Sequence, residues 1–233
     1  MKTSHRRLFL FCSFCIGLLN AIINGNADAT LESATLGPGW SDSLRTGGMF
    51  DIQLLRQTES LRQPFDLAEG VAVSPGEYAF TVFEGRYFTS FTRRWHGSVD
   101  VVAGPFYDGN RMAAGVRPSW NVSRYLNVSG AYRFERVRFP ERDSGFNAHI
   151  LRLRFQGTFN TAVSCAAFVQ YNSAIDAVIT NLRFRYNPRE GVDLYLIYNH
   201  GLNTDRYRLI PILPRTDNRI VLLKYSHTVN MGI

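Results

Sequence analysis

The chain has 233 residues, of which 26 are Lys or Arg and 19 are Asp or Glu, for a net charge of +7. This length suits one sizeable all-β domain. Cys165 is the only cysteine beyond the N-terminal segment described next, which excludes a disulfide framework and a cysteine metal site for the remainder.

The first 29 residues are typical of a secretory signal. A basic start at Lys2, Arg6 and Arg7 precedes an apolar run from Leu8 to Ile23. Ala27-Asp28-Ala29 has the small-x-small form of a cleavage site, so we interpret residues 1–29 as a signal peptide. An uncleaved anchor helix is the alternative. Residues 30–48 are rich in Gly, Ser and Thr and are expected to be a flexible lead-in.

Residues 49–233 are assigned to one β-barrel domain. From Glu77 to the C-terminus the sequence repeats one unit, in which ten to thirteen residues of alternating polarity precede a short break of Gly, Asn, Asp, Pro or Ser. Nine such units predict strands at Glu77–Ser90, Gly97–Tyr107, Arg111–Val122, Tyr125–Phe139, Asn147–Gly157, Ala162–Asn172, Val178–Tyr186, Val192–Asn199 and Arg219–Thr228. Met49–Arg56 is a candidate tenth. Short breaks between long strands favour antiparallel hairpins. The longest break, 201–218, is the best candidate for a loop that is exposed at the surface or folded into the interior.

The alternation gives each strand one apolar and one polar face. Leu151, Leu153 and Phe155 oppose Arg152 and Arg154, because successive side chains on a strand point to opposite faces. A soluble β-sandwich has the same period. The signal, the length of the strands and the many aromatic residues near strand ends favour a membrane barrel instead. The predicted fold is therefore an all-β, antiparallel up-and-down β-barrel of about 8–10 strands of the outer-membrane type.

The polar face of such a barrel would line its lumen. The candidate lumen-facing residues are Arg133, Glu135, Arg152, Arg154, Arg183 and Arg185. One hypothesis is an anion-attracting lumen that passes or holds acidic solutes. The other is an internal ion-pair network with Glu135, Asp176 and Asp193 that fills a small barrel and closes it.

No catalytic motif stands out. The four histidines beyond the signal, His96, His149, His200 and His227, have no partner at metal-ligand spacing. Neither a G-x-S-x-G elbow nor a phosphate-binding glycine loop is present. We therefore predict no cofactor, no metal and no catalytic residue. Nucleic acid is not an expected partner, because the basic residues alternate with apolar ones instead of forming one patch.

Several segments in order resemble a known family. They are Phe65-Asp-Leu, Pro75-Gly-Glu-Tyr, Gly104-Pro-Phe-Tyr-Asp-Gly, Phe168-Val-Gln-Tyr-Asn, Thr180-Asn-Leu-Arg-Phe-Arg-Tyr, Asp193-Leu-Tyr-Leu-Ile-Tyr-Asn and Leu222-Leu-Lys-Tyr-Ser. Together they resemble the C-terminal barrel region of large exported bacterial proteins of unknown function, over about residues 46–228. Such proteins usually also carry a module like the family-nine carbohydrate-binding modules, which this chain lacks. The resemblance implies a surface barrel linked to carbohydrate binding or breakdown.

The sequence thus predicts an outer-membrane protein in contact with lipid, which supports polysaccharide capture or uptake at the cell surface. Two alternatives from other classes stay open. One is a membrane-embedded hydrolase that acts on carbohydrate, and the other is a soluble secreted β-sandwich that binds carbohydrate.

Overall fold

A computed structural model describes residues 19–25, 31–68, 70–208 and 210–228. Within these residues the regular structure is strand, apart from one short 3-10 helix, η1 (Pro140–Arg142). No helix in this part of the chain is long and apolar enough to cross a membrane. The strands are β1 (Leu19–Gly25), β2 (Leu31–Ser43), β3 (Met49–Leu61), β4 (Phe65–Ala68), β5 (Val71–Val73), β6 (Gly76–Phe88), β7 (Trp95–Phe106), β8 (Gly109–Asn121), β9 (Leu126–Phe139), β10 (Ser144–Thr158), β11 (Val163–Asn172), β12 (Ala177–Arg189), β13 (Val192–Asn203) and β14 (Thr216–His227).

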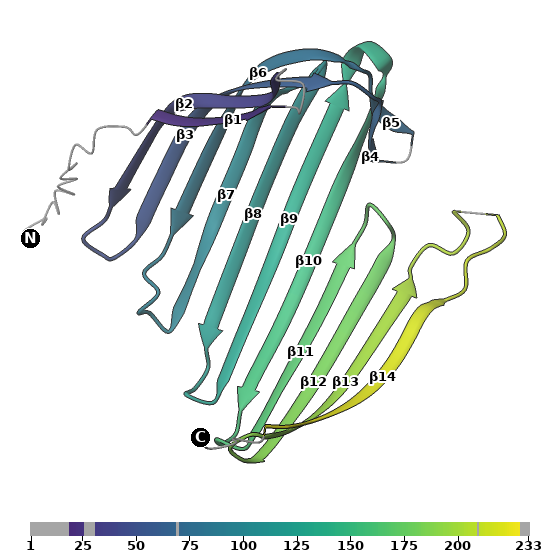
Figure 1. The fold of residues 1–233 in the computed structure, drawn as a ribbon. Coiled ribbons are helices and arrows are strands. Elements are labelled where there is room, and N and C mark those ends of the chain that lie inside the picture. The colour runs from purple at the N-terminus through teal and green to yellow at the C-terminus, as the bar shows by residue number, and fades with distance from the viewer. Residues whose placement is uncertain (1–18, 26–30, 69, 209, 229–233) are drawn as a thin grey trace, which may run out of the picture.

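Twelve of these strands form one antiparallel sheet in the order β1-β2-β3-β6-β7-β8-β9-β10-β11-β12-β13-β14 (Figure 1). Each strand pairs with the next one along the sheet, and the small hairpin β4–β5 is inserted between β3 and β6. The predicted all-β, antiparallel up-and-down fold is confirmed. Within the described residues the sheet is open, because β1 and β14 each have a strand partner on one side only.

The predicted number of strands was too low. All ten expected strands are present, but β1 and β2 extend the sheet to twelve. Residues 31–43, expected to be a flexible lead-in, form β2 and pair with β3 from Ser33 opposite Glu59 to Ser43 opposite Met49. Gly37-Pro38-Gly39 suggested a loop, yet the backbone of β3 provides a partner for the flanking residues.

The predicted signal peptide overlaps β1. Residues 19–25 pair with β2, with Leu19 opposite Pro38. Residues 1–18 and 26–30, which hold the basic start and the expected cleavage site after Ala29, lie outside the described residues. The signal peptide therefore stays a prediction. Cleavage after Ala29 would remove β1 from the mature sheet.

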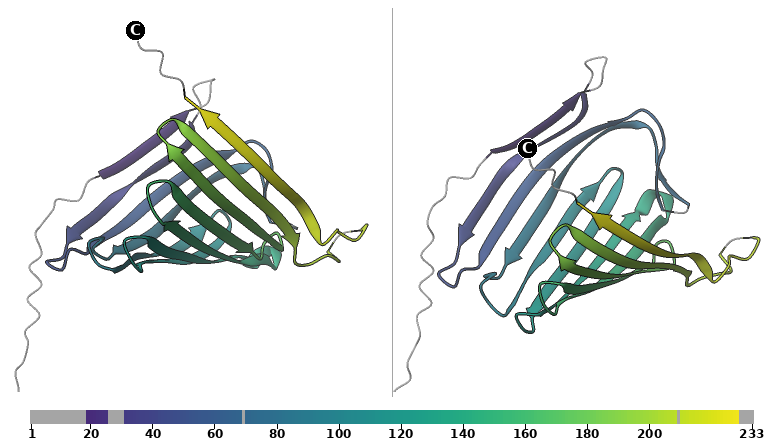
Figure 2. Two further views of the ribbon diagram at one scale, coloured as in Figure 1. Left: turned by 90° about the horizontal axis from the view of Figure 1, so that it is seen from below. Right: turned by 60° about the horizontal axis from the view of Figure 1, so that its bottom comes forward.

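The sheet curves strongly, so that its first and last strands bend toward the same side and the sheet has a concave and a convex side (Figure 2). A β-sandwich would need two sheets packed face to face. The structure instead has one large sheet bent around a concave side, which is the arrangement of a barrel wall.

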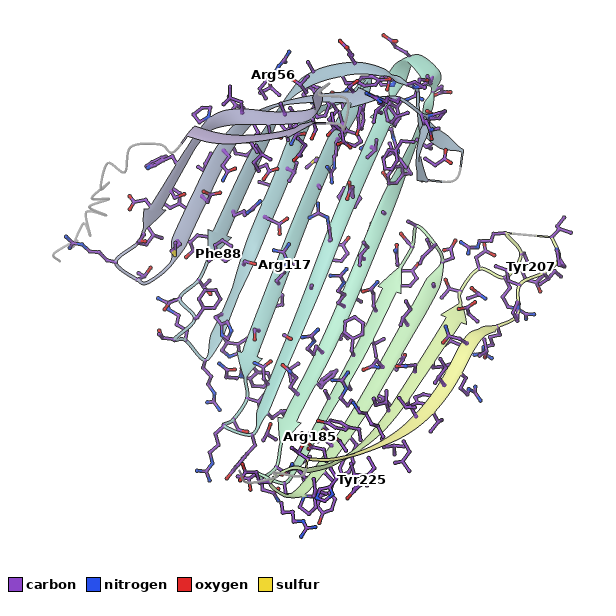
Figure 3. The ribbon with its side chains drawn as sticks, in the orientation of Figure 1. Arg56, Phe88, Arg117, Arg185, Tyr207 and Tyr225 are labelled. Carbon is purple, nitrogen blue, oxygen red and sulfur yellow. The ribbon has the colours of Figure 1, made fainter. Side chains whose placement is uncertain are left out.

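The hairpin β4–β5 packs on the concave side near one end of the sheet. Val71 and Val73 are buried there against Val137 and Phe139 of β9. Phe139 and Val73 are completely shielded from solvent. The sequence left open whether the 201–218 break would be exposed at the surface or folded into the interior. In the structure residues 65–73 fold inward, whereas the 204–215 loop is exposed, with Tyr207 projecting beyond the sheet (Figures 1 and 3).

The two ends of the sheet differ in the length of their connections. At the end that we call the lower end, the connections are short: 44–48, 89–94, 122–125, 159–162 and 190–191. The opposite, upper end carries the two longest connections, which are the segment with the inserted hairpin and the 204–215 loop, together with the short connections 107–108, 140–143 and 173–176 (Figure 1). In outer-membrane barrels the short turns face the periplasm and the long loops face outward.

Candidate functional site: the two faces of the sheet

The strand register sorts the side chains into two continuous faces. Val116 of β8 lies opposite Tyr132 of β9, which lies opposite Leu151 of β10, and Leu151 lies opposite Tyr171 of β11. This face is apolar and exposed from β3 to β14, and we call it the outer face. Its large exposed side chains include Ile52, Leu54, Phe83, Val99, Val101, Val116, Leu151, Leu153, Phe155, Leu182, Phe184, Leu196, Val221 and Leu223.

An exposed apolar surface of this extent is unusual for a soluble monomer. On β9 the apolar stretch of the outer face runs from Leu126 to Phe134, interrupted only by Gly130. That length approaches the ~9–11 tilted residues that span a bilayer. The outer face therefore has the chemistry and the height of a lipid-facing surface. Cys165 lies on it, exposed and opposite Phe184.

Aromatic side chains border this apolar surface. Near the lower end, Trp95 of β7 lies opposite Trp120 of β8, and their rings stack at 4.5 Å between centroids. Other lower-border aromatics are Tyr87, Tyr186 and Tyr225. Toward the upper end lie Tyr132, Phe134, Tyr171 and Tyr198. Tyr and Trp favour the membrane–water interface, where one end of the side chain is apolar and the other is wet. Two such borders are typical of an outer-membrane barrel.

The opposite, inner face lines the concave side (Figure 3 looks into it). The register places all six sequence-predicted residues on this face: Arg133, Glu135, Arg152, Arg154, Arg183 and Arg185. Period-two alternation was enough to assign them, because none of the strands concerned has a bulge between these positions.

Over β7–β9 the inner-face charges form an ion-pair network. Asp100 of β7 is nearly buried and lies 2.7 Å from Arg117 of β8 and 3.2 Å from Arg133 of β9. Arg133 reaches Asp100 across β8 because the residue between the two in the register is Gly115, which has no side chain. A Cβ at Gly115 would come within 2.7 Å of the Asp100 carboxylate. Glu135 continues the network, 2.7 Å from Arg111 and 3.5 Å from Arg133.

We expect Asp100→Ala to lower the free energy of unfolding by about 1–3 kcal/mol, because it removes the acid shared by two arginines. Both arginines are partly exposed, which keeps the cost below that of a fully buried pair. The change in the free energy of unfolding is measured by denaturant titration, monitored through tryptophan fluorescence. Glu84→Gln is the control, since the exposed Arg86–Glu84 pair contributes about 0–1 kcal/mol. Equal effects of the two substitutions would contradict a special role for Asp100.

Over β10–β12 the inner-face residues Arg152, Arg154 and Arg183 have no acidic partner within the described residues, whereas Arg185 pairs with Asp193 of β13. Arg152 donates a hydrogen bond from Nε to Oε1 of Gln170 at 2.8 Å, and the Arg154 guanidinium lies 5.8 Å from the centroid of the Phe168 ring. Arg154 and Arg183 line a hollow of about 330 Å³, together with Gln156, Ala166, Ala167, Phe168 and Asn181. Guanidinium groups with amide and aromatic neighbours form a surface that attracts carboxylates.

The ion-pair network that the second hypothesis expected is present in part, and the anion-attracting lumen stays a hypothesis. Glu135 pairs with arginines, as the network hypothesis expected, and Asp193 accepts a hydrogen bond from Arg185 Nε at 2.6 Å. Asp176, the third acid of that hypothesis, lies in the turn between β11 and β12, and no ion pair to it is found among the described residues. Asp100, at the centre of the network, was not singled out by the sequence pattern. Its role depends on the register of three strands.

The upper end of the concave side is narrowed by the β4–β5 hairpin. Arg142 of η1 donates hydrogen bonds to the Ala72 carbonyl and to Asp108 Oδ1, and so links the hairpin to the β7–β8 turn. Nearby, the Tyr107 hydroxyl donates to Glu59 Oε2 at 2.5 Å. Burial and this hydrogen bond to Glu59 raise the pKa of Tyr107 above its ordinary value, so the phenol stays a donor at neutral pH.

Groups of three or more His, Cys, Asp or Glu side chains that could hold a metal ion are not found among the described residues. No protein-family model and no curated protein matches the sequence. The family resemblance inferred from the sequence is therefore still a prediction. Two solved structures show a weak similarity to this chain. The NanC porin has a TM-score of 0.39 and 12% identity, over 92% of this chain and 100% of its own. The KdgM porin in complex with disordered oligogalacturonate has a TM-score of 0.33 and 12% identity, over 92% and 99%. Scores this low do not establish a shared function.

Proposed function

We propose that this chain is an outer-membrane β-barrel channel that attracts acidic solutes, including short acidic saccharides, into its interior. The observation that supports the proposal most directly is the distribution of polarity: the convex face has a broad, exposed apolar surface, and the concave face at the same level carries Arg133, Arg152, Arg154 and Arg183. A water-soluble domain buries its apolar face, whereas a membrane barrel turns it toward lipid.

The solute class follows from the uneven charge of the inner face. The acids of β7–β9 neutralise the arginines there, but Arg152, Arg154 and Arg183 keep an uncompensated positive charge on the other half. Charged side chains that line a pore select ions of opposite sign. A carboxylated sugar would meet guanidinium groups for its carboxylates and the Gln156 and Asn181 amides for its hydroxyls.

The proposed location is the outer membrane of a Gram-negative cell, with lipid around the outer face. The short lower connections would face the periplasm, and the upper end, with its inward-folded hairpin, would face outward. Capture of polysaccharide fragments at the upper mouth would precede passage along the arginines.

The first test is expression in a Gram-negative host, followed by electrophoresis of unboiled and boiled outer-membrane fractions and by planar-bilayer conductance. We expect a heat-modifiable band and steady, anion-selective channels. Protein extracted from washed membranes by carbonate alone would contradict a membrane barrel. A heat-modifiable band without channels would contradict the transport role alone.

A further inference from the structure

Basic side chains on the outer face gather just above the apolar surface. Arg56 of β3, Arg136 of β9 and Arg219 of β14 all follow apolar outer-face residues in the direction of the upper end. His149 and His200 occupy equivalent positions on β10 and β13. The channel function proposed above does not use these residues, because they lie on the side away from the hollow.

The strand register shows that these residues belong to the outer face. Arg136 lies opposite Met112 and Asn147, and Arg56 lies opposite Leu36 and Thr81. Arg219 lies directly opposite His200. We call Arg56, Arg136, His149, His200 and Arg219 the outer basic row.

The arginines of this row are exposed and available for a ligand. Arg56 makes one long hydrogen bond, 3.5 Å from its Nη1 to Thr81 Oγ1. Among the described residues, none of the three arginines of the row forms an ion pair with an acid. Side chains placed to neutralise neighbouring acids would show such pairs, as the inner face does.

Aromatic residues accompany the histidines of the row. The Tyr132 hydroxyl and His149 Nδ1 lie 2.9 Å apart, and Phe134 packs against the same imidazole at 5.2 Å between ring centroids. Tyr198 lies 5.8 Å from His200 by the same measure. The row therefore lies at the aromatic border of the apolar surface, at the level where lipid headgroups begin.

We propose that the outer basic row binds the phosphates of anionic lipid headgroups around the upper rim of the barrel. This inference rests on the proposed membrane barrel. Arginine near an anionic lipid surface is attracted electrostatically, and its planar guanidinium can hold one phosphate through two hydrogen bonds. The lower border has aromatics on the same face, but its arginines Arg93, Arg94 and Arg124 lie in the turns, where they contact backbone carbonyls or the Tyr125 ring.

The test uses the full chain, folded in zwitterionic detergent, with phosphorylated lipid A as the probe. Native mass spectrometry and the shift of the heat-modification midpoint report binding. We expect retained lipid and a raised midpoint for the unaltered chain. In the triple variant Arg56→Gln/Arg136→Gln/Arg219→Gln, lipid binding should weaken at least about tenfold.

The matched control is Arg154→Gln/Arg183→Gln, which removes positive charge from the inner face and should leave lipid binding unchanged. Dephosphorylated lipid A should bind the unaltered chain more weakly than phosphorylated lipid A does. Inorganic phosphate alone should not raise the midpoint of heat modification. Equal lipid binding by the triple variant, or equal stabilisation by dephosphorylated lipid, would overturn the inference. The heat-modifiable band is expected without added lipid A. Absence of the band would therefore contradict the membrane barrel itself, not only the lipid site.

Discussion

Arg154→Glu combined with Arg183→Glu will remove the anion preference of the channel and favour cations. The two guanidinium groups line the same hollow on the inner face, and neither has an acidic partner among the described residues. Reversing both changes the local charge by four units. In water, each unit of charge changes the energy of a permeating ion about 10 Å away by about 0.4 kcal/mol. The ratio of anion to cation permeability should therefore fall about tenfold or more. Reversal potentials under a salt gradient measure this ratio.

A control for that experiment comes from the other face of the sheet. Arg56→Gln/Arg136→Gln removes two positive charges from the outer face and should leave the permeability ratio unchanged. The heat-modifiable band confirms that each variant folds. Unchanged selectivity in a folded Arg154→Glu/Arg183→Glu channel would contradict the role of the inner-face arginines.

Replacement of residues 64–74 by a short Gly-Ser linker will raise the single-channel conductance, on the order of twofold. This segment holds the β4–β5 hairpin, which packs into the upper end of the concave side through Val71 and Val73. Its removal deletes the apolar side chains that cover Val137 and Phe139 but breaks no pairing of the large sheet, because β3 pairs directly with β6. Single-channel recordings before and after the change measure the effect.

The exposed loop at the same end provides the matched control. Shortening it between residues 206 and 213 leaves the hydrogen bond from Asn203 Nδ2 to the Pro214 carbonyl in place and should not change the conductance. Arg142→Ala offers an intermediate case, because it removes the hydrogen bond to Ala72 that fastens the hairpin. We expect the open-channel current of the Arg142→Ala variant to fluctuate more than that of the unaltered chain. Equal conductance in all three variants would show that the hairpin does not limit the pore.

The sequence predicted the strands of the barrel wall because long runs, most clearly those of β9, β10 and β12, alternate in polarity between short breaks. The segments it missed lack that signal for different reasons. β2 contains Gly37-Pro38-Gly39 and few large apolar residues, so its strand conformation depends on pairing with β3. β1 lies in an apolar run that reads equally well as a signal. β4 and β5, with four and three residues, are too short to show any period.

The candidate site was predictable to the same extent. Alternation assigned the six charged residues to one face without any knowledge of the register. It could not show that Asp100 and Arg133 meet over Gly115, because the two residues are separated by a third strand. For the same reason the sequence left two hypotheses open for the polar face. The register decides that one half is an ion-pair network and the other half is not.

The strand order has a consequence for how the molecule assembles. Every pairing in the large sheet joins strands that are consecutive in the chain or separated only by the β4–β5 hairpin. Such a sheet can form by successive addition of hairpins, each with a small loss of chain entropy. Closure of a barrel would instead join β1 to β14, at opposite ends of the described chain. That one step carries nearly all of the long-range entropy cost. Until it occurs, β14 exposes Ile220, Val221, Leu222 and Leu223 along an unpaired edge, which is the segment most prone to intermolecular pairing.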